Sequence, residues 1–285
     1  MSMGRPDPPT TLNVVITGQI CCGDQYLTAA LSDHPKITCH SVLLDADDSV
    51  RRYYHELYFG DSVNTPDWLV EGHISGEQYL TNKIFDNALK GESVIGVSVL
   101  YPHLYARDLW DYFSNWCRVG DFCLVHMKRN PVCCFASLKM WERDGNTLDS
   151  PAVTKFNRGY ADVVGHPSTF PGGFPSRSVV PVQVDPDELY AFVRMQIAAE
   201  MKVATMCEDR LEFSYEELIQ GFAGLSPHLF EFLGLGPVPR RMVQKWVKRF
   251  KVRQGRPLKG VIANWRSLCA NAPSDIQPYL DPEAL

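Results

Sequence analysis

One stretch, from Phe122 to Trp141, constrains the fold of this chain more than any other. It begins with the apolar run FCLVHM, which has the length and composition of a buried strand. The segment then continues with large apolar residues at helical spacing, namely Phe135, Leu138 and Trp141. Between the two parts, Pro131 suits the first position of a helix and Asn130 the cap before it. We therefore expect a strand, a tight turn and a helix.

This corner has the features of an anion site. The start of a helix carries unpaired backbone N–H groups and a partial positive charge, and here it follows directly after Arg129. Arg129 adds a guanidinium group, and Ser137, about two helical turns further on, adds a hydroxyl group. The same residues also allow a second interpretation, in which Arg129 is a surface cation and Ser137 a small packing residue.

Patterns typical of buried strands alternate along the chain with patterns typical of helices. Strands are expected at Leu12–Gly18, Lys36–Leu44, Val94–Leu100 and from Phe122, and helices are expected from Gln25, Asp45, Ser75 and Arg107. The residues Asp185 to Glu188 are expected to start a long helix, Leu189–Cys207, which is followed by a strand and turn over 211–219. This alternation predicts an α/β fold, with a doubly wound central parallel sheet flanked by helices.

The length of 285 residues suits a single domain that covers residues 1–285 and buries a sizeable core. We expect a flexible tail at residues 1–11. The stretch 143–184 is rich in proline and glycine and is expected to be an insertion that serves as a lid or recognition element, with disorder as the open alternative. Residues 237–270 form a basic C-terminal segment within an acidic chain.

Composition narrows the possible partners. The net charge of −5 offers no overall basic field for nucleic acid or membrane, and no apolar run has the length of a membrane span. With no signal-peptide pattern at the start, we expect a cytoplasmic protein. None of the nine cysteines makes a CxxC spacing, so we expect reduced thiols and no metal site. The sequence gives no indication of the oligomeric state.

The loop after the first predicted strand looks like a phosphate cradle. Gly18 and Gly23 stand at the two glycine positions of a GxxxxG loop between a strand and a helix. A P-loop continues with Lys and with Ser or Thr, which hold the phosphates and magnesium, whereas this chain has Asp24 and Gln25. The pattern therefore disfavours a nucleotide kinase or a P-loop NTPase.

Several segments, taken together and in order, resemble the sulfotransferases that use 3'-phosphoadenosine 5'-phosphosulfate (PAPS), especially the bacterial carbohydrate and nodulation-factor type. GQICCGDQYLTAALSDHP, from Gly18 to Pro35, is similar to the family's G-P-P-R-S-G-T-T-x-L-L segment that runs on to H-P. Met127 to Pro131 with the later Ser137 resembles its L-V-R-D-P signature and following serine. IGVSVLYPHL, SYEEL and RQGRPLKGVIANWRSL resemble further segments, so the resemblance spans nearly the whole chain.

The resemblance implies a P-loop-like sulfotransferase architecture and the transfer of a sulfuryl group from PAPS, by in-line attack, to a hydroxyl or amine of a small-molecule or carrier-bound acceptor. The product would be adenosine 3',5'-bisphosphate, and no metal is needed. The implied nucleotide-binding residues are Arg129 and Ser137 at the 3'-phosphate, Arg253, Gln254 and Gly255 in a loop that closes over it, and Cys22, Gly23, Asp24, Gln25 and Tyr26 around the 5'-phosphosulfate. Aromatic residues that could line the acceptor site are Trp68, Phe170 and Phe174.

The chain departs from the family pattern where the transferring group should lie. Cys21 replaces a basic residue, Asp24 and Gln25 replace Ser or Thr, and Ser98 replaces a lysine. Each change removes a positive charge or a hydroxyl group, and one missing donor costs about 2.7–4 kcal/mol in comparable oxyanion sites. Lys128, Lys139 or an arginine of the insertion could take over.

The proton acceptor expected of the family is a Glu or a His, and His40 at the end of the second strand is the first candidate. His73 and His103 are the others, and a lone histidine on a strand is also compatible with a purely structural role. Three hypotheses remain: an active PAPS-dependent sulfotransferase, a catalytically degenerate sulfotransferase-like protein used for binding or as a scaffold, and another nucleotide-dependent transferase. The missing P-loop residues disfavour the third.

Overall fold

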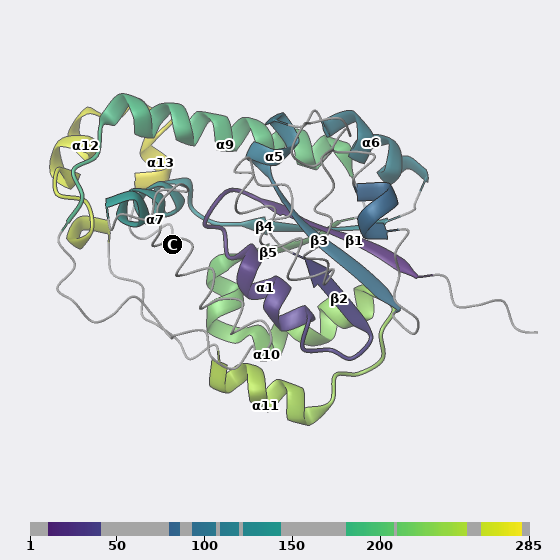
Figure 1. Ribbon diagram of the computed structural model, residues 1–285. Helices are drawn as coiled ribbons and strands as arrows, with labels where there is room; N and C mark the ends of the chain where they lie inside the picture. The colour runs from purple at the N-terminus through teal and green to yellow at the C-terminus, as the bar shows by residue number, and fades with distance from the viewer. Residues whose placement is uncertain are drawn as a thin grey trace, which may run out of the picture.

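A five-stranded parallel sheet forms the centre of the protein (Figure 1). The computed structural model describes residues 11–40, 80–85, 93–106, 109–119, 122–143, 181–207, 210–249 and 258–280. The strands are β1 (Leu12–Gly18), β2 (Ile37–His40), β3 (Val94–Leu100), β4 (Phe122–Lys128) and β5 (Arg210–Ser214), in the order β2-β3-β1-β4-β5. Every neighbouring pair runs parallel. The predicted α/β class with a central parallel sheet is confirmed.

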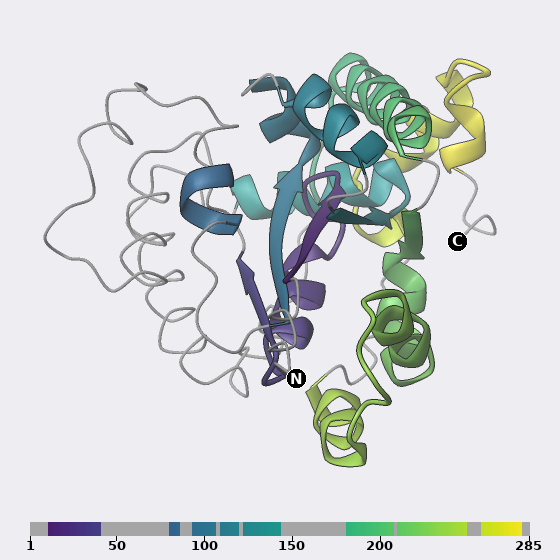
Figure 2. The ribbon, with the colours of Figure 1, turned by 90° about the vertical axis from the view of Figure 1, so that its right-hand side faces the viewer.

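Helices cover both faces of this sheet (Figures 1 and 2). One face carries α1 (Asp24–Leu31), α10 (Tyr215–Phe232) and α11 (Arg240–Arg249); the other carries α5 (Tyr101–Ala106), α6 (Trp110–Val119) and α9 (Pro186–Met206). The central strands are almost continuously apolar because both of their faces are buried, and β3 is buried over its whole length.

A second apolar cluster lies beside the sheet, around α7 (Pro131–Arg143). Residues of α7 pack there against α9, a short 3-10 helix at Leu258–Gly260, α12 (Trp265–Asn271) and α13 (Gln277–Leu280). An isolated parallel bridge between Val182 and Ile262 ties the segment before α9 to the C-terminal part of the chain. The strand, turn and helix predicted for Phe122–Trp141 are therefore the junction of two cores.

Most of the predicted elements are present near their expected bounds. The strands β1 and β3 match, and α9 begins as expected, with Asp185 as the N-cap and Pro186 in the first turn. The predicted helix from Ser75 is described only at Leu80–Phe85, as a π-helical turn. Of the predicted strand Lys36–Leu44, residues 41–44 lie outside the described residues, as do 1–10, the predicted helix from Asp45 and most of the 143–184 insertion.

The prediction of a strand and turn over 211–219 was wrong in its second half. β5 is followed at once by the long helix α10. A capping box starts this helix, because the Ser214 hydroxyl accepts from the Glu217 backbone N–H while the Glu217 carboxylate accepts from the Ser214 N–H. The short helix α5 directly after β3 was not predicted either. No helix in the described ranges is long and apolar enough to cross a membrane.

Candidate functional site

Three neighbouring strands of the sheet, β1, β4 and β5, end at the same edge, and a candidate site lies where the segments after them meet. In a parallel sheet the carboxyl ends of the strands share one edge, which is where ligands usually bind in open α/β folds. Gly18 ends β1 beside Met127 of β4, and Lys128 at the end of β4 lies beside Ser214 of β5. The loop 19–23, the corner at 129–130 and the start of α10 are thus brought together.

The loop after β1 turns sharply into α1. Gly23 precedes the helix with a φ of 96°, in the left-handed region, and a Cβ atom at this position would lie 2.7 Å from Cδ2 of the Tyr215 ring. Cys21 also has a positive φ, of 65°. Because Gly23 has no side chain, α1 begins without a side-chain cap.

Arg129 connects the three segments. Its Nη1 donates to the Cys21 carbonyl oxygen at 2.7 Å, and its guanidinium lies over the Tyr215 ring, 4.1 Å from the ring centroid. The Arg129 carbonyl oxygen accepts from Nε2 of Gln196 on α9 at 2.9 Å. These contacts hold the side chain in place, so the alternative of a loose surface cation is wrong. Its Nε is buried and has no hydrogen-bond partner among the described residues, which is the arrangement expected of a donor that awaits an anion.

The expectation of free N–H groups at the start of α7 was wrong. Asn130 is the cap, as predicted, but its Oδ1 accepts from the backbone N–H groups of Val132 at 2.9 Å and Cys133 at 3.3 Å. Pro131 has no N–H, so the first turn of α7 is already satisfied by the protein. Ser137 is half-buried, one turn beyond Cys133 on the same face of the helix. The start of α7 therefore has no free N–H group to offer, and Arg129 is the remaining candidate group for an anion at this corner.

Two of the departures from the family pattern contact each other. Oγ of Ser98 on β3 donates to Oδ2 of Asp24, in the first turn of α1, at 2.7 Å. Both residues are buried, with exposed fractions of 1% and 4%. The carboxylate therefore lies against the sheet at the uncapped start of α1, where its negative charge complements the helix dipole.

The thiols of the loop are not nucleophiles at neutral pH. Burial raises the pKa of Cys21 to about 11, while the positive charge of Arg129 opposes this shift and the negative charge of Asp24 adds to it. Cys22 is fully buried, and burial with the nearby Asp24 charge raises its pKa further. The eight cysteines whose side chains the structure describes form no disulfide.

The two described histidines proposed as proton acceptors are both buried. His40 ends β2, two strands away from β1, and burial lowers its pKa to about 4. Nδ1 of His103 accepts from the Leu100 backbone N–H at 3.2 Å at the start of α5, a structural role. The third candidate, His73, lies outside the described residues.

The lysines expected to replace the missing donors are bound elsewhere. Nζ of Lys128 donates to Oε2 of Glu212 at 2.7 Å, and Lys139 pairs with Glu188 of α9. Each lysine therefore already neutralises a carboxylate.

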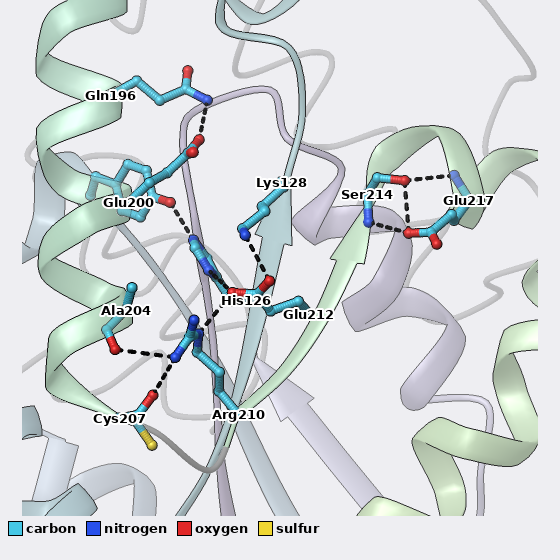
Figure 3. Close-up of polar contacts among 11 residues, drawn as sticks. His126, Lys128, Gln196, Glu200, Ala204, Cys207, Arg210, Glu212, Ser214 and Glu217 are labelled. Atoms are coloured by element: carbon cyan, nitrogen blue, oxygen red, sulfur yellow. Dashed lines mark hydrogen bonds and ion pairs between the residues drawn. The ribbon is translucent and has the colours of Figure 1, made fainter. Parts of the chain in front are cut away.

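A polar network extends from the site between β4, β5 and α9 (Figure 3). Its centre is His126, fully buried, whose Nε2 lies 2.5 Å from the Tyr101 hydroxyl and whose Nδ1 lies 3.4 Å from Oε1 of Glu212. Burial raises the pKa of Glu212, but hydrogen bonds from Lys128 and Arg210 outweigh this effect and hold it at about 2. Burial, reinforced by Lys128, lowers the pKa of His126 to about 4. His126 is thus a neutral imidazole.

A separate pair on α9 links that helix to the corner at Arg129. Nε2 of Gln196 donates to Oε1 of Glu200 at 2.8 Å (Figure 3), and it also donates to the Arg129 carbonyl oxygen. Burial raises the pKa of Glu200, against the effects of Gln196 and Lys128. Gln196 is 1% exposed, and its hydrogen bond to the Arg129 carbonyl oxygen helps to hold the backbone of the corner in place.

Some predicted binding residues lie outside the described residues: Arg253, Gln254, Gly255, Trp68, Phe170 and Phe174. The C-terminal segment is described again from Leu258, which packs in the cluster that contains Val132 and Ala136 of α7. Gln25 and Tyr26 belong to the first turn of α1 as backbone. Of the predicted set, the described residues bring together Arg129 and the loop with Cys22, Gly23 and Asp24.

Sequence reasoning missed two residues that shape the site, Tyr215 and Gln196. Tyr215 follows the capping serine in the SYEEL segment, so its place at the start of α10 was accessible from the capping-box pattern. Gln196 has no such signal, because it stands within a long helix and reaches Arg129 only through the tertiary fold.

No family model matches the chain, and no curated protein matches it in sequence. Among solved structures, it is similar to a sulfotransferase from Alicyclobacillus acidocaldarius, with 17% identity, 96% of each chain covered and a TM-score of 0.46. It is also similar to sulfotransferase STF9 from Mycobacterium avium (12% identity, 93% of this chain and 76% of that chain, TM-score 0.44). A third is mouse sulfotransferase SULT7A1 complexed with PAP (12% identity, 96% and 75%, TM-score 0.39).

All three structures bear the name of the family that the sequence resembles. At these identities and TM-scores the similarity is to the fold alone, and the function depends on the residues of the site. No group of three or more His, Cys, Asp or Glu side chains in the described part of the chain is arranged to hold a metal ion.

Proposed function

We propose that this protein is a PAPS-dependent sulfotransferase whose nucleotide site is the edge of the sheet at β1, β4 and β5. The observation that carries the proposal is the position of Arg129. Its guanidinium links the loop after β1 to the corner after β4 and keeps a buried, unpartnered Nε among the described residues. A fixed guanidinium of this kind suits a phosphate, since it offers several donors in one plane.

In this proposal Arg129 and Ser137 bind the 3'-phosphate, and Arg253, Gln254 and Gly255 close over it. Cys22 to Tyr26 surround the 5' end of the nucleotide. When bound, the nucleotide supplies an activated sulfuryl group for in-line attack by a hydroxyl or amine of a small-molecule or carrier-bound acceptor. His40 is the proposed proton acceptor; burial keeps its imidazole neutral, and the same burial makes it a weak base.

Calorimetric titration with adenosine 3',5'-bisphosphate tests the site. We expect wild type to bind it and Arg129→Ala to lose roughly tenfold to a hundredfold in affinity, the range for a charged hydrogen bond. Arg129→Lys should recover only part of the loss, because lysine lacks the planar fork. Arg194→Ala is the matched control. Arg194 lies on α9, is exposed and pairs with Asp275, which precedes α13. Absence of binding to folded wild type would overturn the proposed site.

The contact between Asp24 and Ser98 favours a second candidate, a sulfotransferase-like protein that binds the nucleotide and transfers nothing. A carboxylate at the start of α1 opposes the negative charge that develops on the sulfuryl group in transfer. The double variant Asp24→Thr with Ser98→Lys restores the residue types of the family. If wild type binds PAPS without turning it over on hydroxyl and amine acceptors, and the double variant gains turnover, the second candidate is correct.

A further inference from the structure

Gln19, the first residue after β1, has a buried amide group of which only one half is bonded. The residue is 1% exposed, and its Oε1 accepts from the Ile20 backbone N–H at 2.8 Å. This bond fixes which side of the amide carries the oxygen and which the nitrogen. Nε2 has no hydrogen-bond partner among the described residues. A buried donor without a partner is costly, and an acceptor that does not belong to the chain removes this cost.

The hydrogen bond to Ile20 also shows where the amide lies. Because Oε1 contacts the backbone of the next residue, the side chain folds back onto its own loop. This loop follows β1, which lies between β3 and β4 in the middle of the sheet. Ligands of open α/β sheets bind at the carboxyl ends of such strands. Nε2 is therefore a donor at the sheet-edge site.

The backbone of the loop already uses several of its polar groups. The Ile20 N–H donates to the Gln19 side chain, and the Cys22 N–H donates to the Gln19 carbonyl oxygen at 3.0 Å. The Cys21 carbonyl oxygen accepts from Arg129. These bonds hold the loop in one shape and occupy two of its N–H groups, so a ligand at the loop depends more on side-chain donors.

Charged donors for the 5' end of a nucleotide are missing or engaged. Cys21 and Ser98 stand where the family pattern has basic residues. Lys128 and Lys139 each pair with a carboxylate. By contrast, Nε2 of Gln19 is fixed, buried and unpartnered among the described residues, and it belongs to the loop itself.

We propose that Nε2 of Gln19 donates a hydrogen bond to an oxygen of the nucleotide's 5'-phosphate group and so takes over part of the role of the missing basic residue. This inference rests on the proposed function, which places the 5' end of PAPS at the loop between β1 and α1. The phosphate oxygen is charged, so this bond is stronger than one between two neutral groups.

The test is calorimetric titration of the full chain with adenosine 3',5'-bisphosphate and with adenosine 3'-phosphate, which has no 5'-phosphate. For Gln19→Leu we expect a roughly tenfold loss in affinity for the bisphosphate, the effect of one hydrogen bond to a charged acceptor. The affinity for adenosine 3'-phosphate should change less than about threefold, because its phosphate is bound at a separate group, Arg129.

Gln19→Glu is the second variant, and it also covers the case that Gln19→Leu does not fold. It keeps an acceptor for the Ile20 N–H but replaces the donor with an anionic oxygen, so the bisphosphate should lose more affinity than in Gln19→Leu. Gln244→Leu is the matched control. Gln244 is exposed on α11, so this variant should bind both nucleotides as wild type does.

The outcomes separate the two proposals. An unchanged affinity for the bisphosphate in Gln19→Leu, or an equal loss for both nucleotides, would overturn the role of Gln19 and leave the nucleotide site standing. A loss confined to Gln19→Glu would do the same, because it would come from the added charge. If folded wild type binds neither nucleotide, the proposed function fails and this inference fails with it.

Discussion

Arg129 and Asp24 show how single residues set the chemistry of this site. Arg129 is held by the Cys21 carbonyl oxygen and the Tyr215 ring, so its side chain needs little reordering to bind an anion. Asp24 is held with similar firmness by Ser98, but its charge is negative. The proposed nucleotide site thus contains two side chains of opposite charge, each fixed by a hydrogen bond.

Gly23 is the residue at which we expect a single methyl group to do most damage. Gly23→Ala places a Cβ 2.7 Å from the Tyr215 ring at a φ of 96°, whereas Gly234→Ala, with a φ of 63°, meets nothing within 4 Å. Strain of this kind costs about 1–3 kcal/mol, so Gly23→Ala should destabilise the protein by at least about 1 kcal/mol more than Gly234→Ala. Urea denaturation of the two variants measures the difference. Equal losses would show that the Tyr215 contact does not constrain the loop.

Two buried histidines make stability depend on pH. The folded pKa of His126 and of His40 is about 4, below the ordinary 6.5, so the unfolded chain binds protons first as the pH falls. Stability should therefore decrease as the pH falls from about 6.5 towards 4, by up to about 1.4 kcal/mol per pH unit for each histidine. Urea midpoints at several pH values measure this slope.

A variant assigns the slope to one residue. His126→Gln should be less stable than wild type at pH 8 but lose less on acidification to pH 5. Glu212, whose folded pKa is about 2, contributes stability that is lost only below about 4.5, so it does not distort this window. An unchanged slope in His126→Gln would contradict a neutral, buried imidazole at this position.

At the scale of elements, the three helix starts near the site are built differently. The start of α7 is closed by Asn130, whose side chain occupies the first N–H groups, while α1 follows Gly23 without a side-chain cap. The start of α10 is fixed by the Ser214 and Glu217 capping box (Figure 3), and the ring of the next residue, Tyr215, lies against the Arg129 guanidinium. The cap of α7 therefore leaves no free N–H group at that helix start, and the cap of α10 fixes the position of the Tyr215 ring beside Arg129.

The capping box of α10 gives a prediction for both stability and binding. Ser214→Ala should destabilise the protein by about 1 kcal/mol, the usual value of such a cap, and weaken binding of adenosine 3',5'-bisphosphate because Tyr215 is less well placed. Thr205→Ala is the control, because this exposed hydroxyl near the end of α9 donates to the Lys202 carbonyl oxygen of its own helix and should matter little. Denaturation and titration on both variants test the pair; a loss in stability with full binding would separate the cap from the site.

At the scale of the whole molecule, the corner after β4 joins two apolar cores. Met127 belongs to the cluster of the sheet, α1 and α10, and Val132 to the cluster of α7, α9 and the C-terminal helices. Arg129 lies between them in the chain, next to the point where Gln196 holds its carbonyl oxygen. A ligand bound to Arg129 should therefore stabilise the molecule as a unit.

Thermal unfolding measures that coupling. A nucleotide present at a hundred times its dissociation constant adds about 2.7 kcal/mol to the stability of the folded state. For a chain of this size we expect the melting temperature to rise by roughly 4–5 °C with adenosine 3',5'-bisphosphate. The rise should be absent in Arg129→Ala and present in Arg194→Ala. A rise that persists in Arg129→Ala would place the nucleotide elsewhere.

The elements of the sheet and the corner at Arg129 were readable in the chain itself. Apolar runs of strand length and the residues Asn130, Pro131 and Asp185 are local signals, since burial on both faces of a sheet and helix capping act within a few neighbouring residues. For the same reason α9 was predicted from its first turn onwards. The departure at Asp24 was also visible, as a missing lysine and hydroxyl group.

What those residues do was decided by contacts between distant parts of the chain. Ser98 and Asp24 are 74 positions apart, and Gln196 and Arg129 are 67 apart, yet each pair is joined by one hydrogen bond. Such bonds form only after the parallel strands have brought their carboxyl ends to one edge, and no local pattern records them. The chain therefore specified an arginine at the turn after β4, while the tertiary structure joined its carbonyl oxygen to Gln196 and placed the Asp24 carboxylate against Ser98.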